Sequence, residues 1–251
     1  MTLGIAFEGC ACRSAWQVGV AEWLVARGVR LSVAAGASSG ALVAAAVALG
    51  EVPRMREVWL DVTTRYQPYD RSALRRGRWP GRMSHVLRAG LAPMVGELRL
   101  AQVPGPLAIA VTELGLFGPR PRMLTQADPY TLMDAILASC FLPGPYSRLP
   151  VLGGRPMVDG AWRHRVPVDA LGPLGATRRL ALTTHPRGLR VGGLLRRRTL
   201  AWPDEVRVLA PDGELPIRGF DFDPPRTLQA MAQGHQDAAA FARAHEAWLA
   251  G

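Results

Sequence analysis

The chain has 251 residues, of which 49% are hydrophobic and 20% are charged. This composition excludes a disordered protein and favours a globular fold with a sizeable core. All 30 cationic residues are arginine, against 20 acidic ones, and the resulting charge of +10 would attract anionic membranes or nucleic acid unless it reflects only a biased genome composition.

The first fifty residues predict a strand, a helix, a second strand and a second helix. Residues 3–7 form an apolar run typical of a buried strand. Residues 16–24 carry apolar side chains at helical spacing, and Gly28 stands where a helix C-cap belongs. Residues 30–35 predict the second strand and residues 38–49 an alanine-rich helix. Such an order predicts parallel strand pairing.

The next segment divides into an amphipathic helix and a basic stretch. Residues 53–66 place apolar side chains on one helical face. Residues 69–88 are rich in arginine and look irregular, with Trp79 among them. We expect a basic insertion or lid here, at about residues 67–100, that faces an anionic membrane; a solvated basic face is the alternative.

The remaining elements complete an α/β pattern. The predicted strands and helices are residues 107–112 (strand), 122–124 (strand), 129–138 (helix), a strand ending at 158, 179–184 (strand), 206–209 (strand) and 226–249 (helix). We therefore expect a mostly parallel central sheet with helices on both faces, in a single domain over residues 1–251.

The cysteines and the N-terminus indicate the compartment. Cys10, Cys12 and Cys140 do not make a disulfide framework, and no second Cys or His pair completes a metal site around the first two. The N-terminus lacks the basic and apolar regions of a secretory signal, and residues 41–49 are too short an apolar run to cross a bilayer. We expect a cytoplasmic protein, with peripheral membrane contact as an option.

Gly36-Ala37-Ser38-Ser39-Gly40 matches G-x-S-x-G between a predicted strand and a predicted helix. A strand-to-helix turn puts the middle serine on a tight elbow with its Oγ exposed, beside the free N–H groups of the helix N-terminus. The alternative is an ordinary serine N-cap. The elbow, with Gly36 and Gly40 at its ends, makes Ser38 a candidate nucleophile.

A nucleophilic serine needs a base, usually a histidine oriented by a carboxylate. By chain order, the histidines that follow the serine could serve: His164, His185, His235 and His245. However, the α/β-hydrolase fold has several strands before its nucleophile, whereas only two predicted strands precede Ser38. None of these histidines stands in a recognisable motif.

Three ordered segments resemble those of the patatin-like phospholipases, whose Ser–Asp dyad works without histidine. Residues 9–17 resemble the glycine-rich loop of the family, residues 36–42 its elbow, and residues 159–161 its Asp-Gly-Gly/Ala motif. Residues 138–143 and 166–169 resemble the segments that flank this motif. The resemblance covers about residues 3–240 and implies a three-layer α/β sandwich.

The resemblance also implies the roles of the residues. Asp159, followed by Gly160, would accept the proton of Ser38 and would need a raised pKa; otherwise the Asp-Gly pair is a simple turn. The backbone amides near Gly9, Cys10 and Ala11 would form the oxyanion hole.

The glycine-rich loop departs from the family pattern at two positions. Ala11 and Ser14 replace glycines, which would strain the loop if either position requires a positive φ. Arg13 is kept, and we expect it to anchor the loop or meet an anionic head group. The loop also resembles a dinucleotide-binding fingerprint, but the glycine set is incomplete and no acidic residue follows the next strand.

We therefore expect a lipid acyl hydrolase that forms an acyl-serine intermediate on an acyl lipid substrate, with no cofactor or metal and no nucleic acid partner. Two alternatives stay open. The same fold could carry an acyltransferase or a thioesterase, or the altered loop could belong to a catalytically silent lipid-binding protein.

Overall fold

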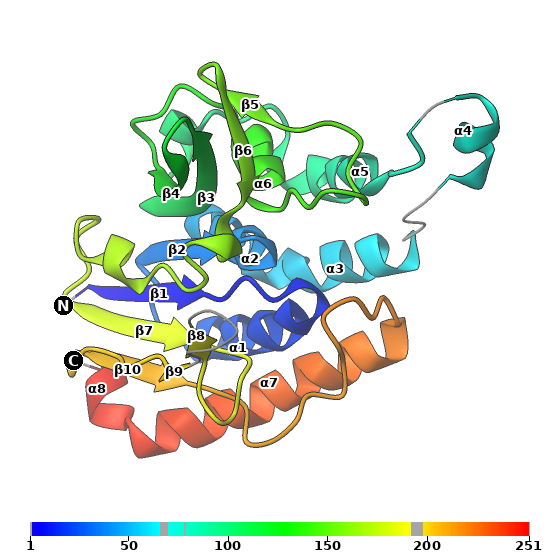
Figure 1. Cartoon of the computed structure of the whole chain (residues 1–251). Coiled ribbons are helices and arrows are strands. Elements are labelled where there is room, and N and C mark those ends of the chain that lie inside the picture. Colours follow the sequence, from blue (N-terminus) through cyan, green and yellow to red (C-terminus); the bar gives the residue numbers. More distant parts are fainter. Residues whose placement is uncertain (1, 66–69, 78, 192–197, 251) are drawn as a thin grey trace.

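The computed structural model describes residues 2–65, 70–77, 79–191 and 198–250. In this part of the chain, one eight-stranded sheet has the order β10-β7-β1-β2-β3-β6-β5, with β4 paired to β3. Figure 1 shows the strands on the left of the view, with the N-terminus beside the start of β1.

The strands around β1 run parallel and those beyond β3 run antiparallel. The parallel set is β1 (Leu3–Phe7), β2 (Val33–Ala37), β3 (Leu107–Gly115), β7 (Arg178–Leu182) and β10 (Val206–Leu209). The antiparallel additions are β4 (Gly118–Leu124), β5 (Val151–Leu152) and β6 (Arg155–Asp159). The short strands β8 (Arg190–Val191) and β9 (Arg198–Thr199) form a separate pair.

Alternate residues of β1 pack on opposite faces of the sheet, as the two-residue period of a strand requires. Ile5 and Phe7 join the larger apolar core, which contains α1 (Ser14–Ala26), α2 (Ser39–Leu49) and α7 (Pro224–Ala244). Ala6 joins a smaller core on the other face, beneath the 3₁₀ helix Val168–Leu171. Figure 1 shows α7 along the lower edge of the molecule, below β10.

The fold class predicted from the sequence is confirmed: the sheet is mostly parallel and helices surround it. Several boundaries differ. The second strand covers Val33–Ala37 instead of residues 30–35. The C-terminal helix, predicted as residues 226–249, is two helices, α7 and α8 (Glu246–Ala250), because the backbone leaves helical geometry at His245.

The basic stretch is more regular than predicted. The prediction of irregular structure over residues 69–88 is wrong for residues 83–88, which belong to the helix α5 (Met83–Val95). The apolar side chains of this helix recur at helical spacing and pack against α3 (Met55–Thr64) and α6 (Leu132–Ser139). Its Gly90 lies so close to Val62 that an added Cβ would stand 2.6 Å from the valine Cγ2.

The first part of the expected insertion forms the short helix α4 (Arg71–Arg75), which Figure 1 shows away from the sheet, beyond α3 and α5. Residues 67–69 and 78 of that expected insertion lie outside the described residues. No helix among the described residues is long and apolar enough to span a membrane.

Candidate active site

Ser38 lies at the sharp turn between β2 and α2. Its backbone has φ 52° and ψ −129°, a conformation that L-residues rarely adopt and that is typical of a strained nucleophile elbow. The flanking glycines are required by close packing: a Cβ on Gly36 would stand 2.3 Å from Gly40 O, and one on Gly40 would stand 2.6 Å from Phe7 O. The turn therefore fixes Ser38 at the carboxyl end of the parallel strands.

Asp159 is the last residue of β6, which pairs with β3 at Val111. The structure brings this side chain to Ser38, whose Oγ–H donates a 2.7 Å hydrogen bond to Asp159 Oδ2. The other carboxylate oxygen, Oδ1, accepts 2.8 Å from the N–H of Ala161. Gly160 passes so close to β3 that a Cβ there would stand 2.0 Å from Ala110 O. Both oxygens of Asp159 are thus held in place.

The environment of Asp159 favours a protonatable carboxylate. The side chain is buried, and desolvation raises its pKa from 3.8 to about 6, although Ser38, the Ala161 amide and the charge of Arg165 oppose the rise. A carboxylate with this pKa is charged at neutral pH and is a stronger base than an exposed one. The carboxyl group can therefore accept a proton from Ser38 and return it.

Ser139 supports the elbow from the C-terminal end of α6. Its Oγ accepts 2.8 Å from the N–H of Ser38 and donates 2.6 Å to the carbonyl of Ala110. The hydroxyl is buried, so both bonds are shielded from water. The role of Ser139 was not predicted from the sequence; its only signal was its place in the segment before Asp159.

The backbone N–H groups of the loop after β1 differ in whether they already have an acceptor. The N–H of Gly9 donates 2.9 Å to Arg165 O, and the N–H of Cys10 donates 3.2 Å to Ser39 Oγ. The N–H of Ala11 has no acceptor among the described residues, and Ala11 lines the same pocket as Ser38 and Asp159. Of the three amides expected in an oxyanion hole, Ala11 is the one free to bind a new oxygen.

The two departures from the glycine pattern behave differently. Ala11 has φ 51°, so this position does require the left-handed conformation and the alanine is strained. Ser14 has φ −62° and is the first residue of α1, so the strain expected there is absent. The Ser14 hydroxyl instead lies 2.7 Å from Ser39 Oγ, linking the first loop to the start of α2.

Glu8 is a buried carboxylate that the sequence analysis did not identify. Its Oε1 lies 2.8 Å from Arg165 Nε and 3.2 Å from His185 Nε2, and its Oε2 accepts from Thr183 and Thr184. Burial opposes the charged form, but these partners outweigh it and lower the pKa of Glu8. A charged residue directly after an entirely apolar strand was the signal that could have found it.

The cysteines near the site are protonated thiols. Burial is the main cause that raises the pKa of Cys10 to about 12 and the pKa of Cys140 well above 9.0. Neither is a ready nucleophile or metal ligand, because both chemistries need the thiolate. Over the part of the chain that the structure describes, no three His, Cys, Asp or Glu side chains could together hold a metal ion.

The histidines considered as bases lie in other interactions. His164 contacts Asp169 at 2.7 Å and His235 contacts Glu22 at 2.9 Å. His245 packs against Phe241, with ring centroids 4.3 Å apart. His185 Nε2 lies 3.0 Å from Arg13 Nη2. Among the described residues, the side chain that bonds to Ser38 Oγ is Asp159 and not a histidine.

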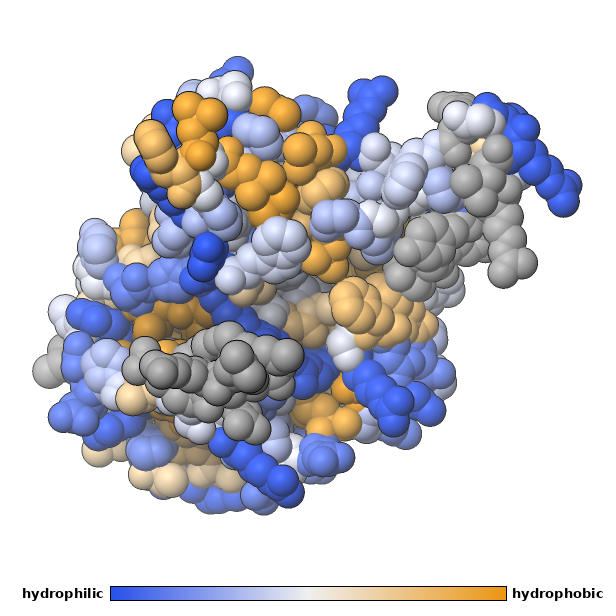
Figure 2. Space-filling model, viewed as in Figure 1, coloured by the Kyte–Doolittle hydropathy of each residue, from blue (hydrophilic) through white to orange (hydrophobic). Residues whose placement is uncertain are grey.

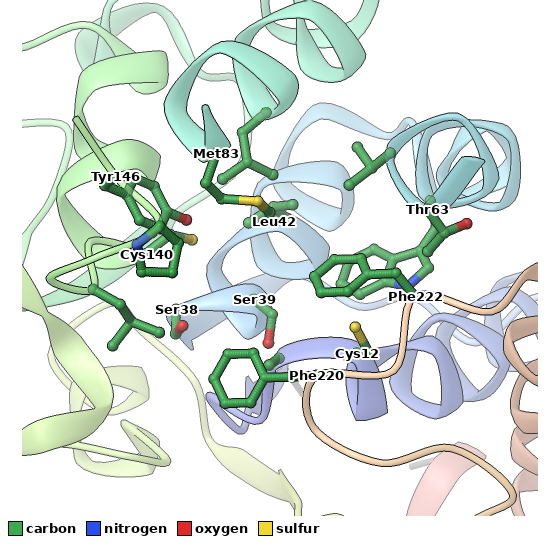
Figure 3. A pocket seen from close by; sticks show the side chains of 16 residues that line it. Cys12, Ser38, Ser39, Leu42, Thr63, Met83, Cys140, Tyr146, Phe220 and Phe222 are labelled. Atoms are coloured by element: carbon green, nitrogen blue, oxygen red, sulfur yellow. The ribbon is translucent and has the colours of Figure 1, made fainter. Parts of the chain in front are cut away.

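A narrow cavity of about 80 Å³ opens beside Ser38. Figure 3 shows Ser38 and Ser39 at the cavity, with Met83 and Tyr146 on one side and Phe220 and Phe222 on the other. Most of its other lining residues are apolar, among them Leu42, Trp59, Val62, Leu87 and Leu142. Such a lining suits a hydrocarbon chain whose reacting carbon stands at Ser38.

Comparisons with known proteins agree with this geometry. The family model described as patatin-like phospholipase matches residues 5–171, which contain both Ser38 and Asp159. Among solved structures, VipD from Legionella pneumophila is similar with a TM-score of 0.57 and 12% identity, over 97% of this chain and 67% of VipD. This similarity is evidence of a common fold only.

A second solved structure, ExoU in complex with SpcU from the type III secretion system of Pseudomonas aeruginosa, has a TM-score of 0.42 and 15% identity. The match covers 94% of this chain and 52% of that one, so the chain spans about half the length of ExoU. A search of curated protein sequences found no match.

Proposed function

Because the chain belongs to the patatin-like phospholipase family, we propose that it is a lipid acyl hydrolase in which Ser38 is the nucleophile and Asp159 its base. The observation that carries the proposal is the 2.7 Å hydrogen bond between Ser38 Oγ and Asp159 Oδ2, at a strained elbow and beside an apolar cavity. The substrate is a carboxylic ester of a phospholipid or a related acyl lipid.

The first half of the reaction acylates the serine. Ser38 Oγ attacks the ester carbonyl carbon while its proton passes to Asp159 Oδ2. The tetrahedral intermediate then collapses, the bond between carbon and the alcohol oxygen breaks, and the proton on Asp159 passes to the leaving alcohol. The acyl group remains on Ser38 as an ester.

The second half uses water in the same way. Asp159 accepts a proton from the water that attacks the acyl carbon, the fatty acid leaves, and Ser38 recovers its proton. In both halves the negative oxygen of the intermediate needs hydrogen-bond donors. The free N–H of Ala11 and the N-terminus of α2 are the donors we assign to it.

Contact with an anionic membrane is a further part of the proposal. Trp162 and Phe220 line the pocket over the dyad and are 55% and 69% exposed. Figure 2 shows hydrophobic side chains gathered over the upper part of the molecule, where Figure 1 places β4, β5 and β6. The positive charge of the chain would draw this surface to anionic lipids.

Hydrolysis of a panel of acyl esters tests the proposed reaction. We expect Ser38→Ala and Asp159→Asn to lose nearly all turnover, while His164→Ala and His235→Ala keep most of it. Full activity of Ser38→Ala would refute the proposed nucleophile. Acyl transfer to an added thiol or alcohol that outpaces hydrolysis would assign the site to an acyltransferase or thioesterase instead.

Vesicle binding tests the membrane contact. Arg75 and Arg82 are exposed in the basic stretch, and neither forms an ion pair with a described residue. We expect Arg75→Glu combined with Arg82→Glu to weaken binding to anionic vesicles. Affinity equal to that of the wild type would remove this stretch from the proposed contact surface.

A further inference from the structure

A second pocket, polar and about 760 Å³ in volume, adjoins the pocket over the dyad. It shares Arg13, Arg165 and Gly219 with the pocket that contains Ser38 and Asp159. Its size lies within the range of small-molecule sites, roughly 300–1,000 Å³. A ligand could therefore extend from the dyad into this pocket without leaving the protein surface.

The charge of the polar pocket is strongly positive. Four arginines line it: Arg13, Arg165, Arg187 and Arg218. Glu214 is the one acidic residue among its described lining, and Glu8 lies behind Arg165. Arg187 and Arg218 are exposed and form no ion pair with any described residue. Two guanidinium groups are thus left for an anionic ligand.

Arg13 is incompletely satisfied at the border between the two pockets. Its Nη2 donates toward His185 Nε2 at 3.0 Å, but the same Nε2 lies 3.2 Å from Glu8 Oε1. One imidazole nitrogen cannot accept from Arg13 and donate to Glu8 at the same time. The buried Nε of Arg13 also has no acceptor among the described residues. The described residues thus leave part of the hydrogen-bonding capacity of Arg13 unfilled, and its guanidinium lines both pockets.

The polar pocket and the apolar cavity both adjoin the pocket over the dyad, but they share different residues with it. The apolar cavity shares Ala11, Ser38, Leu142 and Phe220 with the pocket over the dyad, whereas the polar pocket shares the arginines. A lipid lying across Ser38 would have its acyl chain in the apolar cavity and its head group among the arginines. Guanidinium groups bind phosphate oxygens through paired hydrogen bonds.

Resting on the proposed function, we infer that the polar pocket binds the phosphate-bearing head group of the substrate, and that the enzyme selects anionic phospholipids over neutral acyl esters. Arg187 and Arg218 determine this specificity, because they are charged, exposed to the ligand and outside the hydrolytic machinery. Their removal lowers the affinity for the head group and leaves the chemistry at Ser38 unchanged.

The test compares two water-soluble esters with the same acyl chain, so that membrane charge plays no part. One is dihexanoyl phosphatidylglycerol, which is anionic, and the other is p-nitrophenyl hexanoate, which is neutral. We expect the double variant Arg187→Gln, Arg218→Gln to lose on the order of tenfold in kcat/KM for the phospholipid and little for the neutral ester. Arg243→Gln, an exposed arginine on α7, is the control and should change neither value.

An unchanged ratio of the two kcat/KM values in the double variant would overturn the inference, and so would an equal loss for both esters. Binding of the phospholipid to Ser38→Ala, measured by calorimetry with and without the two arginine changes, gives a result that does not depend on hydrolysis. Loss of binding in the arginine variant supports the head-group site even if the wild type hydrolyses neither ester. Inorganic phosphate that binds to the arginines while the phospholipid does not would assign the pocket to a free phosphate compound.

Discussion

Because Asp159 is buried, we expect its negative charge to lower the free energy of unfolding, although the proposed mechanism needs that charge for proton transfer from Ser38. The pKa of this carboxyl rises from 3.8 to about 6, chiefly through desolvation. Since each pKa unit corresponds to about 1.4 kcal/mol, the ionised side chain costs the folded state about 3 kcal/mol at neutral pH. The folded pKa lies above the unfolded one. The folded state therefore avoids this cost below pH 3.8, where Asp159 is protonated in both states, and bears it in full once the pH has risen through about 6.

Asp159→Asn removes the charge and keeps the shape. The amide oxygen can still accept from Ala161, and the amide nitrogen can donate to Ser38 Oγ. Relative to the wild type, we expect the unfolding free energy of the variant to be higher by about 0.5 kcal/mol near pH 4 and by about 3 kcal/mol at pH 8. The difference at pH 8 corresponds to roughly 6–12 °C in Tm. Esterase activity should be lost over the whole range.

Urea denaturation at a series of pH values measures this difference. Asp204→Asn is the matched control, because it replaces an exposed carboxylate before β10, at the other end of the parallel strands from the site, with an amide. A difference between Asp159→Asn and the wild type that stays constant from pH 4 to pH 8 would refute the electrostatic argument. A variant less stable than the wild type at pH 8 would do the same.

Three further changes test the groups that support the site. Ser139→Ala removes the acceptor of the Ser38 N–H. We therefore expect kcat to fall with little change in KM, and the unfolding free energy to drop by about 1–3 kcal/mol. An unchanged kcat would contradict this role. Ala11→Gly relieves the positive φ and should raise the unfolding free energy by roughly 0.5–1 kcal/mol in urea, whereas a decrease would show that the alanine is not strained. Glu8→Gln leaves Arg165 without its charged partner and should lower the unfolding free energy by about 3 kcal/mol at pH 7. This loss should shrink as the pH falls through the lowered pKa of Glu8, and a loss independent of pH would contradict the argument.

Local patterns were enough to predict most of the parallel half of the fold. The run at residues 3–7, the G-x-S-x-G elbow and the strand at residues 206–209 each carry a signal within a few residues, and the structure has these elements there. The arginines hid the helix Met83–Val95. The many arginines of this stretch indicated a solvated irregular segment, whereas the apolar side chains of the helix, which pack against α3 and α6, recur at helical spacing.

Long-range contacts account for what the sequence could not predict. Periodicity did not reveal that Ser38 and Asp159 meet; the resemblance to a family supplied that pair. The bonds of Glu8 to Arg165 and His185 join residues more than 150 positions apart, so no local signal connects them. The conformation of Ala11 likewise depends on the closed loop and not on its neighbours in sequence.

The central claim is that Ser38 carries the acyl group during turnover. Mass spectrometry of the protein quenched during hydrolysis of a slowly deacylated ester tests this directly. We expect the mass of one acyl group, located by peptide mapping on Ser38 in the wild type and absent from Ser38→Ala. An acyl group on another residue, or none while hydrolysis continues, would contradict the mechanism.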